Sequence, residues 1–159
     1  MCSLRRTLAA CLLPAAAGAQ ELTVRPRLQA EWRADVLAGP PAGIEFGAGV
    51  NVPLGYYLRL SVDAAAGMAR RGNGAVGSGR AELAGRYLLD PFSEFPWGVY
   101  AGGGLTARWF DDSGWRANLL VVLGLEGPAS HGWRTAVELG AGGGLRLGVV
   151  LRRARQNGR

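Results

Sequence analysis

The sequence predicts a single all-β domain that closes into an antiparallel, up-and-down barrel of eight strands. Three observations lead to this prediction. Apolar and polar residues alternate with a period of two along most of the chain, which is the period of a strand and not of a helix. The alternating segments are joined by hairpin-length connections rich in Gly, Pro and Asp. Their even number lets the first strand pair with the last, so that no edge stays open.

The first 19 residues have the features of a cleaved export signal. Arg5 and Arg6 form a basic start, an apolar run extends from Thr7 to Ala16, and Ala17-Gly18-Ala19 is a small-x-small cleavage site. Both cysteines precede this site, so the mature protein, which we expect to begin near Gln20, has no thiol. After the leader, no apolar run approaches the roughly 20 residues of a membrane helix. The mature chain would therefore cross a membrane only as strands.

The first half of the mature chain contains four alternating segments. In the first, Leu22 to Val36, every second residue is apolar and all the intervening residues are polar. The second strand is expected at Ile44–Val52, and the third at Leu58–Ala64. A Gly- and Arg-rich stretch from Arg70 to Gly79 then predicts a loop, and Arg80–Leu89 predicts the fourth strand.

The second half repeats the pattern four more times. Strands are expected at Trp97–Trp109, Trp115–Glu126, Trp133–Leu139 and Leu145–Arg152, and a polar basic tail follows at 153–159. Most of the eight strands are near the ~10 residues that cross a bilayer at a tilt. The barrel domain is accordingly expected to span residues 20–152.

The composition of the two faces predicts which one points inward. The polar face is dense in arginine and carboxylate, and it also bears Glu126 and Arg152, whereas the other face is apolar. A membrane barrel turns its apolar face to lipid and keeps the polar face inside. Eight strands enclose an interior just wide enough for side chains, so we expect a plugged, Arg-rich lumen. The predicted lumenal charge network consists of Arg25, Arg27, Glu31, Arg33, Asp35, Glu45, Arg59, Asp63, Arg80, Glu82, Arg86, Arg108, Arg116, Arg134, Glu138 and Arg146.

Aromatic residues gather near the strand ends and favour a transmembrane barrel. Two girdles of aromatic side chains at the membrane interfaces are typical of lipid-facing barrels. The predicted girdles are Tyr57, Tyr87, Trp97 and Trp133 at one set of turns, and Trp32, Phe46, Trp109 and Trp115 at the other.

Together, the leader, the eight alternating strands and the aromatic ends resemble the small eight-stranded outer-membrane barrels, the class that includes the OmpX-like and OmpA-like transmembrane domains. The resemblance is one of pattern and covers nearly all of Gln20 to Arg152. It implies residence in the outer membrane of a Gram-negative bacterium, contact with outer-membrane lipid, and insertion by the outer-membrane assembly machinery. It also implies a non-catalytic role, either structural or in binding lipid or a partner.

Two other functions remain open at this stage. A soluble periplasmic, lipocalin-like barrel would turn its apolar face inward around an apolar ligand. A lipid A-modifying hydrolase would use Ser130 and His131, the one Ser-His pair of the chain. This pair falls in the predicted turn Gly127–Gly132, and adjacent residues of a strand point to opposite faces, so a polar turn is the preferred interpretation.

Other chemistries find little support. With one His and no mature Cys, we expect neither a metal site nor a cofactor. The runs Gly102-Gly103-Gly104 and Gly142-Gly143-Gly144 lack the helix and the lysine of a phosphate-binding loop, so nucleotide binding is not expected. The basic residues alternate with apolar ones and form no single patch, which argues against nucleic-acid binding. Arg70, Arg71 and the tail are exposed exceptions, for which lipopolysaccharide phosphates are the expected contact.

Overall fold

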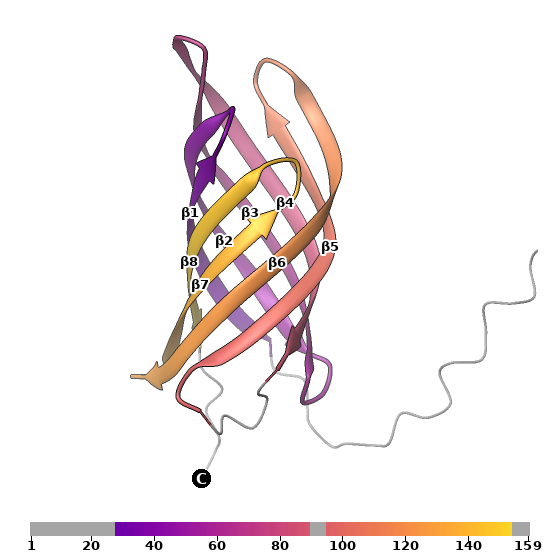
Figure 1. Cartoon of the computed structure of the whole chain (residues 1–159), viewed down its shortest axis with the longest axis vertical. Coiled ribbons are helices and arrows are strands. Elements are labelled where there is room, and N and C mark those ends of the chain that lie inside the picture. Colours follow the sequence, from indigo (N-terminus) through magenta and orange to yellow (C-terminus); the bar gives the residue numbers. More distant parts are fainter. Residues whose placement is uncertain (1–27, 90–94, 154–159) are drawn as a thin grey trace, which may run out of the picture.

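A computed structural model describes residues 28–89 and 95–153. Within them, the chain forms eight strands in one sheet, which wraps around a central axis (Figure 1). The predicted export signal, Arg25, Arg27 and the tail from residue 154 lie outside the described residues. In chain order the strands are β1 (Gln29–Ala38), β2 (Ala42–Pro53), β3 (Leu58–Arg71), β4 (Gly74–Leu88), β5 (Gly98–Phe110), β6 (Gly114–Ser130), β7 (Trp133–Ala141) and β8 (Leu145–Arg153).

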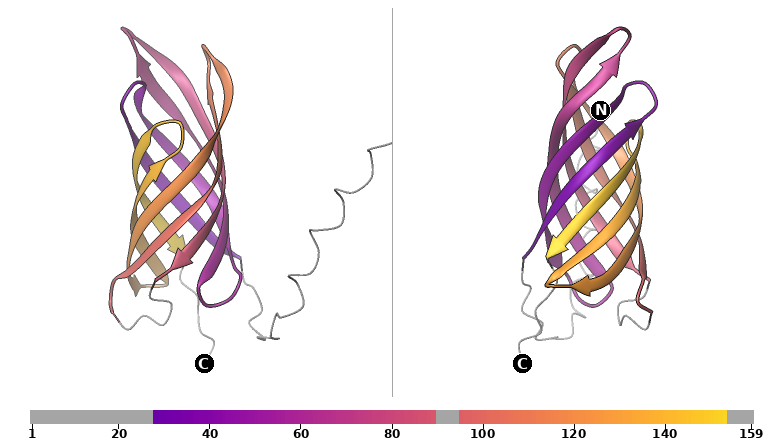
Figure 2. Two further views of the ribbon diagram at one scale, coloured as in Figure 1. Left: turned by 45° about the vertical axis from the view of Figure 1, so that its right-hand side comes forward. Right: turned by 90° about the vertical axis from the view of Figure 1, so that its left-hand side faces the viewer.

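The sheet closes through its first and last strands. Each strand pairs in antiparallel fashion with the next, and β1 pairs with β8 from Glu31 opposite Arg152 to Ala38 opposite Leu145. This confirms the predicted closed barrel of eight strands. The turns after β1, β3, β5 and β7 lie at the upper end in Figure 1, and the described chain finishes at the lower end (Figure 2).

The hairpin of β3 and β4 corrects one prediction. The expected loop at Arg70–Gly79 is wrong, because the two strands stay paired as far as Arg71 opposite Gly74 and turn over two residues. Ladder hydrogen bonds come from the backbone, so a segment of Gly and Ala continues a strand although its side chains carry no alternation. Gly72 has a φ of +60°, which suits the tight turn. The hairpin therefore rises above its neighbours at the upper end (Figure 2).

The turn between β6 and β7 is also shorter than predicted. Strand β6 continues to Ser130 and only His131 and Gly132 form the turn. A β-bulge shifts the register between Glu126 and Ala129. The extra residues of a bulge break the period-two pattern, which explains why the sequence placed a turn there.

Side chains alternate sharply between the lumen and the outside. In β6, Leu119 and Val121 are 79% and 63% exposed, whereas Leu120 and Val122 are 2% and 1% exposed. The apolar face points outward, and the inner face is mainly charged. The lumen also contains Ala136, which the alternation placed on the inner face, and apolar side chains that the alternation did not identify: Leu37, Ala65, Ala69, Ala84, Phe110, Leu120, Val122 and Val150.

The described ranges contain no helix long and apolar enough to span a membrane.

A charged network across the lumen

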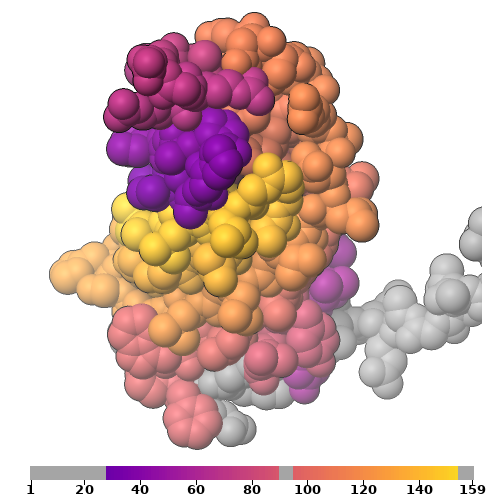
Figure 3. Space-filling view, turned by 45° about the horizontal axis from the view of Figure 1, so that its top comes forward, coloured from indigo at the N-terminus to yellow at the C-terminus, as the bar shows by residue number. Residues whose placement is uncertain are grey.

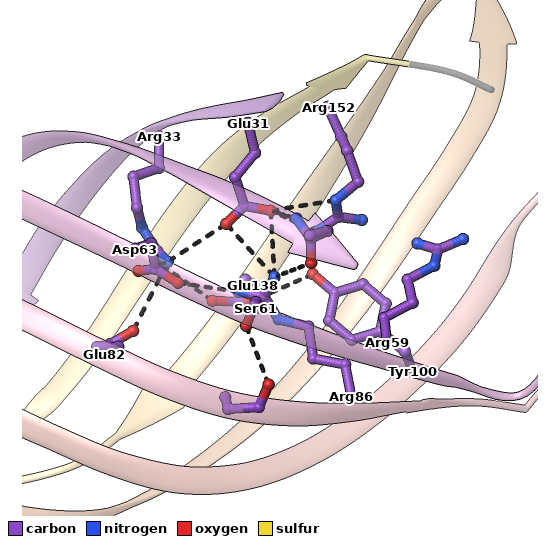
Figure 4. Close-up of polar contacts among 12 residues, drawn as sticks. Glu31, Arg33, Arg59, Ser61, Asp63, Glu82, Arg86, Tyr100, Glu138 and Arg152 are labelled. Atoms are coloured by element: carbon purple, nitrogen blue, oxygen red, sulfur yellow. Dashed lines mark hydrogen bonds and ion pairs between the residues drawn. The ribbon is translucent and has the colours of Figure 1, made fainter. Parts of the chain in front are cut away.

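Charged side chains from all eight strands meet inside the barrel. Figure 4 shows part of this network, in which arginines and carboxylates from strands far apart in sequence point toward one another. The buried members are Glu31, Arg33, Asp35, Glu45, Asp63, Arg80, Glu82, Arg86, Arg108, Glu126, Glu138, Arg146 and Arg152, and Arg59 and Arg134 are half-buried. Burying a charge is costly unless it is paired, so the pairs decide whether this interior is stable.

Arg33 is the hub of the middle of the lumen. Its Nε and Nη2 donate to the two carboxylate oxygens of Asp35, at 2.8 and 3.2 Å. Its Nη1 donates to Asp63 Oδ1 at 2.6 Å, and its Nη2 also donates to Glu138 Oε1 at 2.9 Å. One guanidinium from β1 thus ties together its own strand, β3 and β7. Five donors in a planar fork make arginine suited to this role.

Glu138 is the complementary acceptor on β7. It is fully buried and lies 2.9 Å from Arg33, 3.1 Å from Arg86 and 2.9 Å from Arg146. The hydroxyl of Tyr100 donates to its Oε2 at 3.0 Å. Three cations and a hydroxyl therefore surround one carboxylate.

Tyr100 reaches this position because the facing strand has no side chain there. A Cβ on Gly124, its partner in β6, would lie 2.1 Å from the Tyr100 ring. The ring itself is stacked near Arg86 and Arg152, whose guanidinium carbons are 5.9 and 5.6 Å from its centroid. Tyr100 thus fills the lumen between the middle and the lower end.

A second group, the lower cluster, surrounds Glu126. Arg59 and Arg134 donate to this carboxylate at 2.8 and 2.9 Å, and Arg152 donates to it as well. Arg152 also lies 3.1 Å from Glu31, which joins the lower cluster to the middle. The side chain of Arg134 is 33% exposed, so the cluster opens toward the lower end of the barrel.

The upper part of the lumen is paired less completely. Arg80 contacts Asp35, Glu45 at 3.2 Å and Glu82 at 3.2 Å. Arg108, the next arginine toward the upper end, donates one hydrogen bond, from Nη1 to the carbonyl of Gly143 at 2.8 Å. None of the described carboxylates lies within ion-pair distance of it.

The charges are therefore layered along the barrel. The middle, taken together with Arg80 and its carboxylates, holds four arginines and six carboxylates, a formal charge of −2. The lower cluster holds three arginines and one carboxylate, a formal charge of +2, and Arg108 adds +1 above. The whole network is nearly neutral. The ion pairs form one chain from Arg134 near the lower end to Arg80, and Arg108 lies above the end of this chain without an ion pair to a described residue.

Most of the predicted network lies where the sequence placed it, with three exceptions. Arg25 and Arg27 lie outside the described residues. Arg116 is exposed, because it is the third residue of β6 and has risen to the upper rim. The network prediction also left out Glu126 and Arg152, which the sequence had placed on the polar face and which form part of the lower cluster. It left out Asn51 as well, whose amide donates to Glu31 and whose Oδ1 accepts from Arg86 at 3.1 Å. Its polar-face position was the one sign of that role in the sequence.

The predicted girdle residues lie on the outer face, with one at the wrong end. Tyr57 and Tyr87 stack at 5.7 Å near the lower end, and Trp109 and Trp115 lie 6.5 Å apart beside the β5–β6 turn. Trp32 was expected with the upper group. It is instead the fourth residue of β1 and pairs with Leu151 near the end of β8, which places it nearer the lower end. Phe46, Trp97 and Trp133 are exposed as well.

Ser130 and His131 do come together, contrary to the expectation that they diverge. Ser130 Oγ and His131 Nδ1 are 2.9 Å apart in the exposed β6–β7 turn. His131 has a φ of +50°, in the left-handed region that few residues other than glycine adopt. Among the described residues no carboxylate contacts this His, so the pair lacks the third group that orients a catalytic base.

The upper rim is held by a small polar clasp between two hairpins. Arg71 donates to Asp112 Oδ1 at 2.6 Å and to Ser113 at 3.1 Å, and the backbone amide of Gly77 donates to Asp111 at 2.8 Å. The hydrogen bond from Arg71 holds the pKa of the exposed Asp112 carboxyl below its usual value. In the described part of the chain, no group of three His, Cys, Asp or Glu side chains is placed to hold a metal ion.

Comparison with solved structures gives the same architecture. Neisserial surface protein A is 14% identical, with a TM-score of 0.58 over 80% of this chain and 96% of its own. The N-terminal β-barrel domain of Pseudomonas aeruginosa OprF is 16% identical, with a TM-score of 0.54 over 78% and 96%. The chain has the fold of the small outer-membrane barrels. A de novo designed transmembrane β-barrel is also similar, at 13% identity and a TM-score of 0.56 over 79% and 92%.

These likenesses confirm the predicted resemblance at the level of the fold. No family model matches the sequence, and no curated protein matches it either.

Proposed function

We propose that this protein is an integral outer-membrane barrel that spans the membrane without catalysing a reaction and without conducting ions. One observation carries the proposal: apolar side chains cover the outside while paired charges fill the inside. Lipid is the solvent that suits such an outer face, and the lumenal pairs leave every charge of the middle with a partner. The role would be structural, or would consist of binding lipid or partner proteins at the rims.

The orientation of the faces disfavours the lipocalin-like alternative. A carrier of an apolar ligand needs an apolar interior, whereas Glu31, Glu45 and Glu138 are fully buried in this lumen. The hydrolase alternative depends on Ser130 and His131 alone. If replacement of either residue leaves the lipid A composition unchanged, the hydrolase alternative is excluded.

Cell fractionation with gel electrophoresis tests the location. The outer-membrane fraction is loaded unheated and boiled, because a closed membrane barrel resists detergent and migrates differently until it is heated. We expect the protein in the outer membrane with a heat-shifted band. A soluble protein without the shift would overturn the proposal.

Planar bilayer recording tests the plug. Arg33 forms ion pairs with Asp63 and Glu138 across the middle of the lumen, and these side chains block a continuous water path. We therefore expect no steady single-channel current. A steady conductance of the purified protein would contradict the non-conducting barrel.

The rims are the places where partners would bind. Exposed Arg70 and Arg71 at the upper end are proposed to contact lipopolysaccharide phosphates, and insertion is proposed to depend on the outer-membrane assembly machinery. The double variant Arg70→Gln/Arg71→Gln should lose crosslinking to lipopolysaccharide. Unchanged crosslinking would exclude contact between these two arginines and the phosphates.

A further inference from the structure

Arg108 differs from the other buried arginines of the lumen. It is 5% exposed, yet no described carboxylate lies within ion-pair distance of it. Its Nη1 is held by the carbonyl of Gly143, and its guanidinium lies 5.1 Å from the centroid of Phe110. Its Nε and Nη2 have no hydrogen-bond acceptor among the described residues. Burying a cation that has no counter-ion in direct contact is unfavourable, so Arg108 calls for an anion.

The surroundings of Arg108 add positive charge. In the register of the sheet, Arg108 stands directly opposite Arg80 on β4 and opposite Arg116 on β6. Like charges opposite one another in a sheet are destabilising. Asp35, Glu45 and Glu82 contact Arg80 directly, whereas Glu45 and Glu82 attract Arg108 only from beyond ion-pair distance. Among the described residues, no carboxylate forms an ion pair with Arg116. A row of three arginines thus leads from the exposed rim into the lumen.

The two free nitrogens of Arg108 share one edge of its guanidinium. Arg33 shows what this edge does in the same lumen, since its Nε and Nη2 hold both oxygens of Asp35. Two parallel N–H donors match a pair of oxygens on a carboxylate or a phosphate. Because Gly143 fixes the opposite side of the guanidinium, the free edge of Arg108 has a set direction and is prepared for a bidentate acceptor.

Neighbouring groups favour a phosphate over a simple halide. Thr106, two residues earlier on the same lumenal face, has a buried hydroxyl without a hydrogen-bond partner. Asn118 places its side chain against the β7–β8 turn, where a Cβ on Gly143 would lie 2.5 Å from Nδ2. A tetrahedral oxyanion has enough oxygens to use the guanidinium edge and a hydroxyl together, whereas a chloride ion does not.

We propose that the upper mouth of the barrel contains an anion site centred on Arg108, with Thr106 and Arg116 as further contacts, and that it takes a phosphate group. The phosphate comes either from a lipid headgroup at the membrane surface or from free inorganic phosphate. The site is distinct from the exposed pair Arg70 and Arg71, because its central cation is buried. The site requires only a folded barrel, and it does not require the proposed binding of lipid or partner proteins by Arg70 and Arg71.

Titration of the refolded mature protein with inorganic phosphate tests the site. Binding is followed by calorimetry in phosphate-free detergent, and the heat-shifted band verifies folding in each sample. We expect saturable binding, an Arg108→Gln variant at least about 10-fold weaker, and an Arg116→Gln variant weakened by about 2- to 3-fold because Arg116 is exposed. Arg153→Gln removes the same charge from the lower end and should bind like the wild type.

Thermal stability gives a second measurement that a structural role would not reproduce. Without phosphate, Arg108→Gln should be as stable as the wild type or more so, because it removes an unpaired buried cation. With phosphate, only the wild type should gain stability, because ligand that binds the native state stabilises it. A wild type that does not bind phosphate, or an Arg108→Gln variant that binds equally well, would overturn the site.

Competition separates the two sources of phosphate. Lipid A in the same detergent should displace inorganic phosphate if the site takes a headgroup, whereas lipid A with its phosphates removed should not. Inorganic phosphate binding that lipid A leaves unchanged would assign the site to free phosphate. Displacement by both forms of lipid A would mean that the acyl chains occlude the mouth, and would count against recognition of the phosphate.

Discussion

Arg33 and Arg108 are both buried in the same lumen, but their surroundings are opposite. Arg33 has carboxylates on its whole donor fork, whereas Arg108 has one backbone carbonyl and an edge without an acceptor. The charged side chains of the middle are therefore paired with one another, and we expect these pairs to hold the barrel closed. The upper mouth contains a buried arginine that no described carboxylate contacts, so binding is expected there. Four predictions test this contrast, from the largest effect to the smallest.

Removing the central acceptor should cost the most. Glu138→Gln leaves Arg33, Arg86 and Arg146 without their shared carboxylate, and breaking a buried pair costs about 3–5 kcal/mol. We expect a loss near the upper limit, measured by urea unfolding in lipid vesicles. A loss below about 1 kcal/mol would mean that water replaces the carboxylate and that the middle is not tightly paired.

Burial should separate two arginines that share one acceptor. Arg152 and Arg134 both donate to Glu126, but the side chain of Arg152 is 2% exposed and that of Arg134 is 33% exposed. Arg152→Gln should lower the free energy of unfolding by about 3 kcal/mol and Arg134→Gln by less than about 1 kcal/mol. Equal losses in the same urea experiment would show that water is excluded from Arg134 as well as from Arg152.

The space opposite Tyr100 should be tightly limited. Gly124→Ala puts a methyl group against the Tyr100 ring, and overpacking costs about 1–3 kcal/mol. Tyr100→Ala in the same chain should relieve this cost, so a double-mutant cycle should give a coupling energy of similar size. Additive losses would place the strain elsewhere in β6.

Protonation of Asp112 in the upper clasp should have little effect on the stability of the barrel. The folded-state pKa of Asp112 is lowered from 3.8 by Arg71, so any stability from this pair is present above that value and is lost as the pH falls below it. Arg71→Gln should raise the pKa of Asp112 toward 3.8, as followed by carboxyl NMR titration. The heat-shifted band should persist across this pH range, because both side chains are exposed and solvent screens their interaction. Melting of the barrel in that range would contradict this.

The sequence predicted the strands and their faces because period-two alternation is a local property. It failed where the alternation is broken: the Gly- and Ala-rich hairpin around Gly72 stayed a strand, and the bulge after Glu126 resembled a turn. It also could not tell which charges pair. Whether Arg80 meets Glu45 while Arg108 meets no carboxylate depends on the register and on how far each strand rises toward the rim. Neither quantity is encoded in the spacing of single residues.

The pairing of β1 with β8 has a consequence for assembly. Glu31, Arg33 and Asp35 come early in the chain, and Arg146 and Arg152 come from its last described strand. Asp35 and Glu31 also have partners on β1 and β4, but their ion pairs with Arg146 and Arg152 cannot form until the final strand is delivered. Any partly inserted sheet would expose a charged interior to hydrocarbon, which is strongly unfavourable. We therefore expect insertion into a bilayer and closure of the sheet to be nearly simultaneous, because the lumenal charges disfavour an open sheet in hydrocarbon.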